Sequence, residues 1–384
     1  MISRGDRSFL AEWWRTIDRP LMGAFLLLMF CGLMLSFAAS PPVADRIGVD
    51  EFHFIKRHVL FLIPAVFLLI GLSMLDSVQV RRAAFALFAV SIALLIVTLF
   101  AGVEAKGSRR WLYLAGFTLQ PSEFVKPAFV VITAWLFAEN SRRPDIPGNL
   151  FSIILFAIVA ALLVAQPDFG QTMLVALVWG ALFFMAGMSW IWIAALGALG
   201  ILGMLAAYLL FPHVAGRIDR FVFGEGDNFQ VNTGIEAIVN GGWLGQGPGE
   251  GTVKNILPDS HTDFSFAVAV EEFGILASMI LVGIFAFIVI RSLLRALNEN
   301  NDYVRMASAG LALLFGFQSL INIGVNLKLL PAKGMTLPFI SYGGSSLISM
   351  AIGMGLLLAL TRTRAENRTS STIGFTVRPP RPAE

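Results

Sequence analysis

The sequence predicts an all-α polytopic membrane protein with about ten transmembrane helices. Hydrophobic residues make up 57% of its 384 positions and charged residues only 14%, and the mean hydropathy is +0.76. About a quarter of the residues in an ordinary soluble domain are charged, so much of this surface must face lipid rather than water. Apolar runs long enough to cross a ~30 Å hydrocarbon layer recur along the chain.

The first apolar run has the hydropathy of a signal peptide but not its layout. It is longer than a usual signal core, and the acidic residues Asp6, Glu12 and Asp18 precede it. Because many more runs follow, we interpret it as a retained first helix. The predicted spans are 20–39, 58–75, 83–101, 122–139, 150–166, 169–187, 190–211, 264–290, 304–326 and 343–361.

An even number of spans places both termini on one side of the membrane. Lys and Arg are more numerous on that side, which indicates that the termini are cytoplasmic. The weakest boundary is the turn at 166–170, since missing it would invert every later span. The chain then divides into a cytoplasmic segment 1–19, a membrane domain 20–363 containing a large loop 212–263, and a polar tail 364–384 that we expect to be disordered.

Composition excludes several classes of protein. The net charge of +3 does not indicate nucleic-acid binding, and the single cysteine, Cys31, permits no disulfide framework. The four histidines lack zinc-ligand spacing, so we expect no structural metal.

Unusual polar segments gather on the side opposite the termini. In the first, Arg109 and Arg110 suit an anionic lipid head group or a diphosphate, because guanidinium groups offer forked donors. Trp111 is either part of that site or an interfacial anchor. At the head of the fourth span, Gln120 or Ser122 could satisfy the free helix amides.

Ionisable residues follow inside the predicted spans. Glu123 and Lys126 are spaced i, i+3 and should meet on one helix face, either as a structural ion pair or as part of a site. Asp168 favours an N-cap of the sixth span. Glu271 and Glu272, placed 12–14 Å into the eighth span at ~1.5 Å per residue, need partners, and Lys126 is one candidate.

The loop 212–263 is too long for a passive connector. Its glycine-rich stretch 241–249 lacks the order of a nucleotide-binding loop and would let backbone pass close to a bulky ligand. Asp263, flanked by His261 and Phe264, stands where the eighth span begins. A carboxylate there could act as a base, and an N-cap is the alternative.

The last polar segment precedes the tenth span and contains Lys333. Its hydroxyls and glycines form either a phosphate or sugar cradle or a tightly packed helix entrance. The residues concerned are Ser341, Gly343, Gly344 and Ser345.

Taken together, these motifs resemble the SEDS family (shape, elongation, division and sporulation). The motifs that carry the resemblance are Gln120-Pro-Ser-Glu123, Gln166-Pro-Asp168, Leu257-Pro-x-x-His-Thr-Asp-Phe264, Glu271-Glu272 and Leu337-Pro-Phe-Ile-Ser-Tyr-Gly-Gly-Ser-Ser346. The last of these and Gly107-Ser-Arg-Arg-Trp111 are more similar to the division member than to the elongation member. The segment 229–236 and Lys328 depart from the usual pattern.

The resemblance implies a peptidoglycan glycosyltransferase that polymerises lipid II into β-1,4 glycan strands at the periplasmic face of the bacterial inner membrane, at the division septum. It makes Asp263 the catalytic base and Glu123–Lys126 the family's intramembrane pair. Arg109, Arg110, Arg217 or Lys333 could stabilise the leaving diphosphate. Mg²⁺ or Mn²⁺ could share that task, although no ligand set is evident. A class B penicillin-binding protein and other divisome membrane proteins are the implied partners. Two alternatives stay open: a lipid II flippase, and a scaffold that recruits the transpeptidase.

Overall fold

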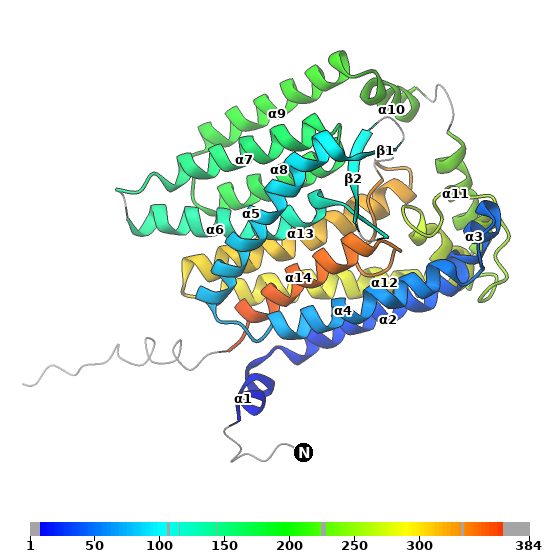
Figure 1. Ribbon diagram of the computed structural model, residues 1–384, viewed down its shortest axis with the longest axis horizontal. Coiled ribbons are helices and arrows are strands. Elements are labelled where there is room, and N and C mark those ends of the chain that lie inside the picture. Colours follow the sequence, from blue (N-terminus) through cyan, green and yellow to red (C-terminus); the bar gives the residue numbers. More distant parts are fainter. Residues whose placement is uncertain are drawn as a thin grey trace, which may run out of the picture.

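All ten predicted spans are helices (Figure 1). The computed structural model describes residues 8–105, 108–114, 116–143, 145–223, 228–331 and 334–363. Eight of the helices are long and apolar enough to cross a membrane, while α8 and α14 are shorter, at 17 residues each. The helices are α2 (Arg19–Ala39), α4 (His53–Leu72), α5 (Ser77–Ala101), α6 (Pro121–Arg142), α7 (Gly148–Ala165), α8 (Phe169–Met185), α9 (Trp190–Leu210), α12 (Ser265–Leu297), α13 (Asp302–Asn326) and α14 (Gly344–Leu360).

Several short elements join these helices. They are α1 (Phe9–Thr16), α3 (Pro41–Ile47), α10 (Pro212–Val222), α11 (Phe229–Gly241), the 3₁₀ helix η1 (Val253–Asn255), and the strands β1 (Val103–Ala105), β2 (Ser108–Leu114) and β3 (Phe117–Leu119). The strands form an antiparallel sheet in the order β1-β2-β3, which the sequence analysis did not predict. In the described part of the predicted loop 212–263, the chain forms two helices, α10 and α11, and the 3₁₀ helix η1.

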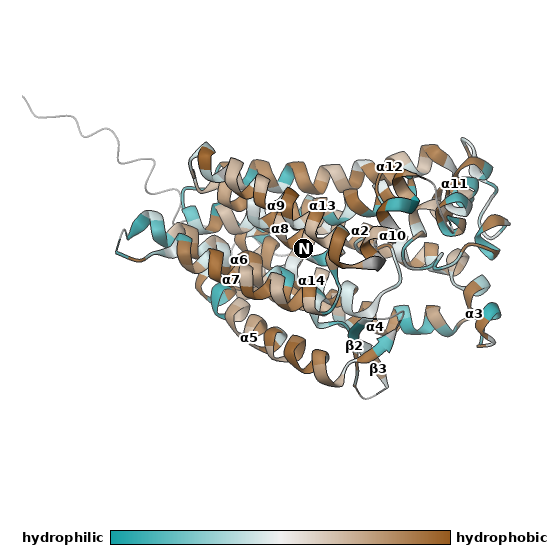
Figure 2. Cartoon of the chain, turned by 90° about the horizontal axis from the view of Figure 1, so that it is seen from above, coloured by the Kyte–Doolittle hydropathy of each residue, from teal (hydrophilic) through white to brown (hydrophobic). Residues whose placement is uncertain are grey.

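The bundle has two distinct ends. At the terminal face, the backbone N–H of Thr363 donates to the carbonyl of Thr16 at 3.1 Å, so the two ends of the described chain lie side by side. The opposite end, the loop face, carries the strands, α3, α10 and α11 (Figure 1). Hydrophobic residues follow the helices and polar residues gather toward the ends (Figure 2). The predicted tail, 364–384, and residues 1–7 lie outside the described chain.

The most buried helices form the centre of the bundle. Most of the apolar stretch of α6 and of α13 is buried inside the protein, whereas none of that of α9 is. The α6 and α13 helices pack on each other, and α14 packs on both. Because α6 and α13 are surrounded by protein, they can carry polar side chains that would be too costly against lipid.

A break divides α12 at Gly274, whose backbone (φ 79°, ψ 171°) is not helical. The glycine-rich segment docks beside this break: the N–H of Gln246 donates to Glu271 O at 2.9 Å, and that of Ile275 donates to Gly242 O at 3.0 Å. A Cβ at Gly245 would lie 2.2 Å from Glu272 O. The glycines thus permit close packing on α12, which corrects the expectation that they admit a bulky ligand.

Candidate active site

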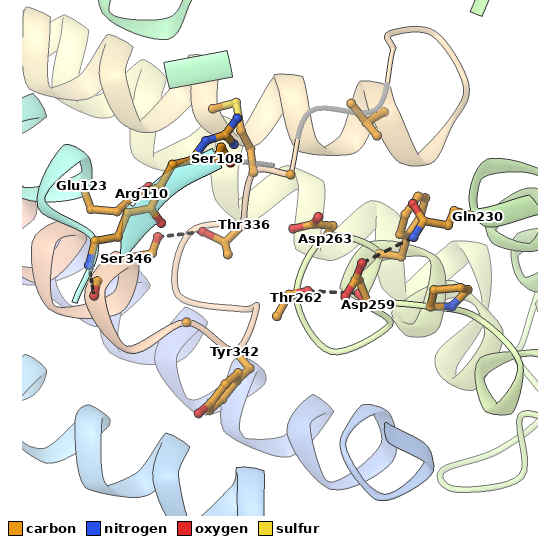
Figure 3. Close-up of a pocket in the computed structure, with 18 of the residues that line it drawn as sticks. Ser108, Arg110, Glu123, Gln230, Asp259, Thr262, Asp263, Thr336, Tyr342 and Ser346 are labelled. Atoms are coloured by element: carbon orange, nitrogen blue, oxygen red, sulfur yellow. Dashed lines mark hydrogen bonds between the residues drawn. The ribbon is translucent and has the colours of Figure 1, made fainter. Parts of the chain in front are cut away.

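A cavity of about 880 Å³ opens at the loop face, and Asp263 lies on its wall (Figure 3). Its other walls come from β2, the start of α6, the start of α11 and the segment between α13 and α14. Figure 3 places Asp263 and Thr336 in the middle, Arg110 and Glu123 toward one side, and Gln230 and Asp259 toward the other. A volume of this size is at the upper end of the range for small-molecule sites.

The structure does not use Asp263 as a helix cap. The residue at the N-cap of α12 is Phe264, which makes no side-chain capping hydrogen bond. A Cβ at Gly334 would stand 3.5 Å from Asp263 Oδ2, and Gly334 has a φ of +63°. A Cβ at this distance would make only an ordinary contact with the carboxylate, so it is the left-handed backbone that favours glycine here.

Arg110 brings a positive charge to one side of the cavity. Its Nε donates to Gln166 O at 3.2 Å, its Nη2 donates to Pro167 O, and its Nη1 is 3.9 Å from Asp168 Oδ1. Asp168 is buried and accepts from the N–H of Gln171 at 3.4 Å, which confirms the predicted cap of α8. The turn 166–170 thus holds the guanidinium at the cavity wall.

Glu123 and Lys126 form the predicted ion pair on one face of α6. Lys126 Nζ lies 2.9 Å from Glu123 Oε2, and the two residues are 0% and 3% exposed, respectively. The ammonium also donates to Gln171 Oε1 at 2.8 Å and Gln318 Oε1 at 3.0 Å, while Glu123 Oε1 accepts from Gln171 Nε2 at 2.6 Å. Glu123 also lines the cavity, so the pair connects the buried core to the cavity wall.

The start of α6 is held in a way that the sequence did not indicate. The backbone N–H of Gln120 donates to Ser345 Oγ at 3.0 Å, and neither Gln120 nor Ser122 caps the helix with its side chain. Ser122 Oγ is buried and has no hydrogen-bond partner in the described chain. Gln120 and Ser345 line the cavity, whereas Ser122 does not.

The segment before α14 lies partly inside the cavity and partly behind it. Gly343, Gly344 and Ser345 line the cavity, as a cradle would require. Ser341 is 4% exposed; its Oγ accepts from the N–H of Leu337 at 2.8 Å and contacts Ser265 Oγ. Its hydroxyl therefore braces the loop and is not part of the described cavity wall.

His261 also lies behind the wall. Its ring is 4.7 Å from that of Phe54 and 5.4 Å from that of Tyr342, and its carbonyl accepts from the N–H of Tyr342 at 2.8 Å. Burial lowers the pKa of His261 to about 4, so the imidazole is neutral near pH 7. It packs the loop beside Asp263 and does not present a charge to the cavity.

The remaining predicted substrate contacts have different outcomes. Trp111 lines the cavity, whereas Arg109 points elsewhere, with Nη2 3.6 Å from Glu104 Oε2. Arg217 lies on α10, but its side chain is not described. Lys333 lies outside the described residues.

Glu271 and Glu272 pair with the outer loop and not with Lys126. Glu271 accepts from the N–H groups of Val253 at 2.7 Å and Lys254 at 2.9 Å. Glu272 Oε1 is 2.5 Å from Lys254 Nζ and accepts from the N–H of Gly251 at 3.2 Å. The α12 helix is continuous from Ser265 through these carboxylates and breaks just after them at Gly274, where the glycine-rich segment docks and brings Lys254 to Glu272.

Several cavity residues were missed by the sequence analysis. They are Arg57, Arg220, Gln230, Asp259, Lys328, Thr336 and Tyr342. Gln230 Nε2 is 3.4 Å from Asp259 Oδ2, and Lys328 Nζ is 3.3 Å from Asn232 Oδ1, so α11 and the start of the 327–343 segment meet here. In the sequence, the only indication of a function was that these residues lie between the predicted spans.

No predicted cation site is found in the described chain. Nowhere among its residues do three His, Cys, Asp or Glu side chains group as metal ligands. A role for Mg²⁺ or Mn²⁺ stays a prediction, because such an ion can be held by one or two carboxylates and the phosphates of a substrate, and the proposed reaction does not depend on it.

Comparison with known proteins defines the class. The profile of the family that groups FtsW, RodA and SpoVE, described as "Cell cycle protein", matches residues 19–366. The chain belongs to this family, the SEDS family, and is a multi-pass membrane protein.

Its relatives indicate a branch within the family. A "Probable peptidoglycan glycosyltransferase FtsW" from Caulobacter vibrioides is 48% identical over 364 residues, covering 94% of this chain and 93% of the relative. A protein with the same name from Pseudoalteromonas translucida is 34% identical, covering 89% and 88%.

Solved structures agree with the fold. A chain from "Structural coordination of polymerization and crosslinking by a peptidoglycan synthase complex" matches with a TM-score of 0.75 at 27% identity, covering 90% of this chain and 97% of that one. The rod shape determining protein RodA of Thermus thermophilus matches with a TM-score of 0.66 at 25% identity, covering 91% and 97%.

Proposed function

We propose that this chain is a peptidoglycan glycosyltransferase of the FtsW type, which polymerises lipid II into β-1,4 glycan strands during cell division. The observation that carries the proposal is Asp263 on the wall of a cavity that also contains Arg110 and Arg57. A carboxylate can accept a proton, and guanidinium groups can bind a diphosphate. The names of the relatives give the same activity.

In the proposed reaction, Asp263 takes the proton from the 4-hydroxyl of the acceptor sugar as that oxygen attacks the anomeric carbon of the donor. The bond between the anomeric carbon and the diphosphate oxygen breaks, and undecaprenyl diphosphate leaves with the electron pair. One displacement converts the α linkage into a β linkage, as when a carboxylate base activates water in an inverting glycosidase. No covalent enzyme intermediate is formed.

Cavity residues would stabilise the charge that develops on the leaving group. Arg110 is held by two backbone carbonyls and is therefore fixed before substrate arrives. A preorganised cation of this kind does not have to reorient during the reaction, which makes it effective at the transition state. Gly343, Gly344 and Ser345 add backbone and hydroxyl groups to the wall of the same cavity.

The reaction requires a particular orientation in the membrane. We place the protein in the bacterial inner membrane at the septum, with the terminal face in the cytoplasm and the loop face in the periplasm. The excess of Lys and Arg on the terminal side supports this orientation. A class B penicillin-binding protein is the proposed partner, since a structural neighbour belongs to a synthase complex that couples polymerization to crosslinking.

A reconstitution assay tests the proposal. Vesicles containing the full chain and its penicillin-binding partner are supplied with labelled lipid II, and products are digested with muramidase. Glycan strands are expected. Transbilayer movement of lipid II without strands would identify a flippase. The absence of both strands and movement would leave only a scaffold role.

Matched variants assign the chemistry to Asp263. Asp263→Asn should lower the polymerisation rate by about 10²–10⁴, the usual contribution of a general base. Asp302→Asn, which removes a carboxylate at the start of α13 near the terminal face, should leave the rate unchanged. Full activity of Asp263→Asn would show that another group accepts the proton.

A further inference from the structure

Three amide side chains form a stripe on one face of α13. Gln318, Asn322 and Asn326 are spaced four residues apart, so they lie one above another along the helix. They are 0%, 1% and 0% exposed. Burying an amide is costly unless its donors and acceptors are used, so the partners of this amide stripe indicate why it is there.

Two of the three amides hold the backbone of the proposed base. Asn322 Nδ2 and Asn326 Nδ2 each donate to the carbonyl of Asp263 at 3.0 Å. Asn326 Oδ1 accepts from the N–H of Ala267 at 3.0 Å, in the first turn of α12. Asp263 and the first turn of α12 are therefore both fixed to α13, one on each side of the N-cap residue Phe264.

The same stripe holds a second segment of the cavity wall, at Met335 and Thr336. The second proton of Asn322 Nδ2 is donated to Met335 O at 2.6 Å, and Gln318 Nε2 donates to Thr336 O at 3.2 Å. Thr336 Oγ1 in turn is 2.7 Å from Ser346 Oγ, at the start of α14. One amide group of Asn322 thus joins the Asp263 carbonyl to the segment that carries the glycine cradle.

We infer that Asn322 and Asn326 are positioning residues, which set the distance and direction of the Asp263 carboxylate relative to the cradle. This inference rests on the proposed function. Both protons of Asn322 Nδ2 are used, and both of its acceptors belong to cavity segments. Through Gln318, which accepts from Lys126 Nζ, the stripe also continues to the buried ion pair.

The inference predicts a specific kinetic signature. Loss of a positioning contact misplaces the base without removing any group that binds substrate, and a displacement of about 1 Å can cost about a hundredfold in rate. Asn322→Ala and Asn326→Asp should therefore lower kcat by about 10- to 100-fold while KM for lipid II changes less than about twofold. Asn326→Asp keeps the acceptor for Ala267, but it also puts a carboxyl group at a site that is 0% exposed, so it should lower the thermal midpoint as well as remove donors.

Ser319→Ala is the matched control. Ser319 is buried on the same helix, and its Oγ donates only to Phe315 O within α13. The assay uses the full chain with its penicillin-binding partner, labelled lipid II, and the thermal midpoint of each variant. The control should keep both kcat and the thermal midpoint, and in each asparagine variant kcat should fall although the protein is still folded at the assay temperature.

The outcomes separate the inference from the proposed function. If the wild type makes strands and both asparagine variants keep wild-type kcat, the positioning role is refuted and the glycosyltransferase assignment stands. If the fraction of unfolded protein at the assay temperature fully explained the loss of kcat in both variants, the asparagines would have a merely structural role. That result would also refute the positioning role. If the wild type makes no strands, the proposed function fails and the positioning role fails with it.

Discussion

Breaking the ion pair inside α6 should destabilise the protein more than any surface substitution on that helix. Lys126→Met removes an ammonium that lies 2.9 Å from Glu123 Oε2 and that is fully buried. Gln171 Oε1 and Gln318 Oε1 lose the same donor. Removing one partner of a buried pair typically costs about 3–5 kcal/mol; here Glu123, at 3% exposed, would lose its counter-ion and keep a neutral donor, Gln171 Nε2.

A double variant distinguishes the cost of an unpaired charge from the value of the pair. Glu123→Gln with Lys126→Met leaves no buried charge, so the free energy of unfolding should recover by at least about half of the loss. Arg143→Met, at the C-cap of the same helix, is the control: Arg143 Nε lies 3.1 Å from Glu139 Oε1 and the arginine side chain is 65% exposed, so its loss should cost less than about 1 kcal/mol.

The assay is equilibrium unfolding in bicelles, with the free energy of unfolding of all four proteins compared. A loss in Lys126→Met no larger than that in Arg143→Met would refute the reasoning, because it would mean that water reaches Glu123. A double variant less stable than the single variant would show that the pair contributes net stability.

Two further predictions concern the loop face. His261→Phe should weaken the pH dependence of stability: the folded pKa of about 4 lies below the ordinary 6.5, so stability is intact above pH 6.5 and is lost as pH falls toward 4. The wild type should lose about 2 kcal/mol more than the variant between pH 7.5 and 5, measured by unfolding at each pH; equal losses would contradict this. Lys254→Met should increase backbone hydrogen exchange across residues 242–255, while Lys56→Met on the same face should not.

Most of the helical fold was predictable from hydropathy, since long apolar runs have few alternatives in lipid. Local spacing also predicted the contact between Glu123 and Lys126 and the cap at Asp168, because both depend on neighbours within one or two turns. The three-stranded sheet was not predictable in the same way. Its strands are three to seven residues long and too short to show an alternating pattern.

Contacts between distant segments explain the other errors. Lys126 was a candidate partner for Glu271 and Glu272 because all three residues lay in predicted spans. The outer loop, however, docks where Gly274 interrupts α12, and Lys254 of that loop pairs with Glu272. Nothing in a single glycine of an apolar run signals such a break. The amide stripe, by contrast, was visible as three amides at four-residue spacing in an otherwise apolar helix, and the spacing could have indicated a polar face.

The Lys254 prediction follows from how the outer loop is fastened. Lys254 and Glu272 are 3% and 1% exposed, and the carboxylate also accepts from the N–H groups of Gly249 and Gly251. Without the ammonium, Glu272 keeps only neutral donors and its buried charge is under-compensated. The loop can relieve this by opening to water, and opening breaks the hydrogen bonds that hold Gln246 and Gly247 to α12.

Hydrogen exchange detects this opening directly. Residues 242–255 should exchange at least about tenfold faster in Lys254→Met; a tenfold change corresponds to about 1.4 kcal/mol, less than the full cost of about 3–5 kcal/mol for breaking a buried pair. The control pair, Lys56 and Asp50, is 2.7 Å apart but mostly exposed, so Lys56→Met should change exchange nowhere in this loop. Unchanged exchange in Lys254→Met would mean that the two glycine N–H groups alone hold Glu272, and that the charge of Lys254 is not what fastens the loop.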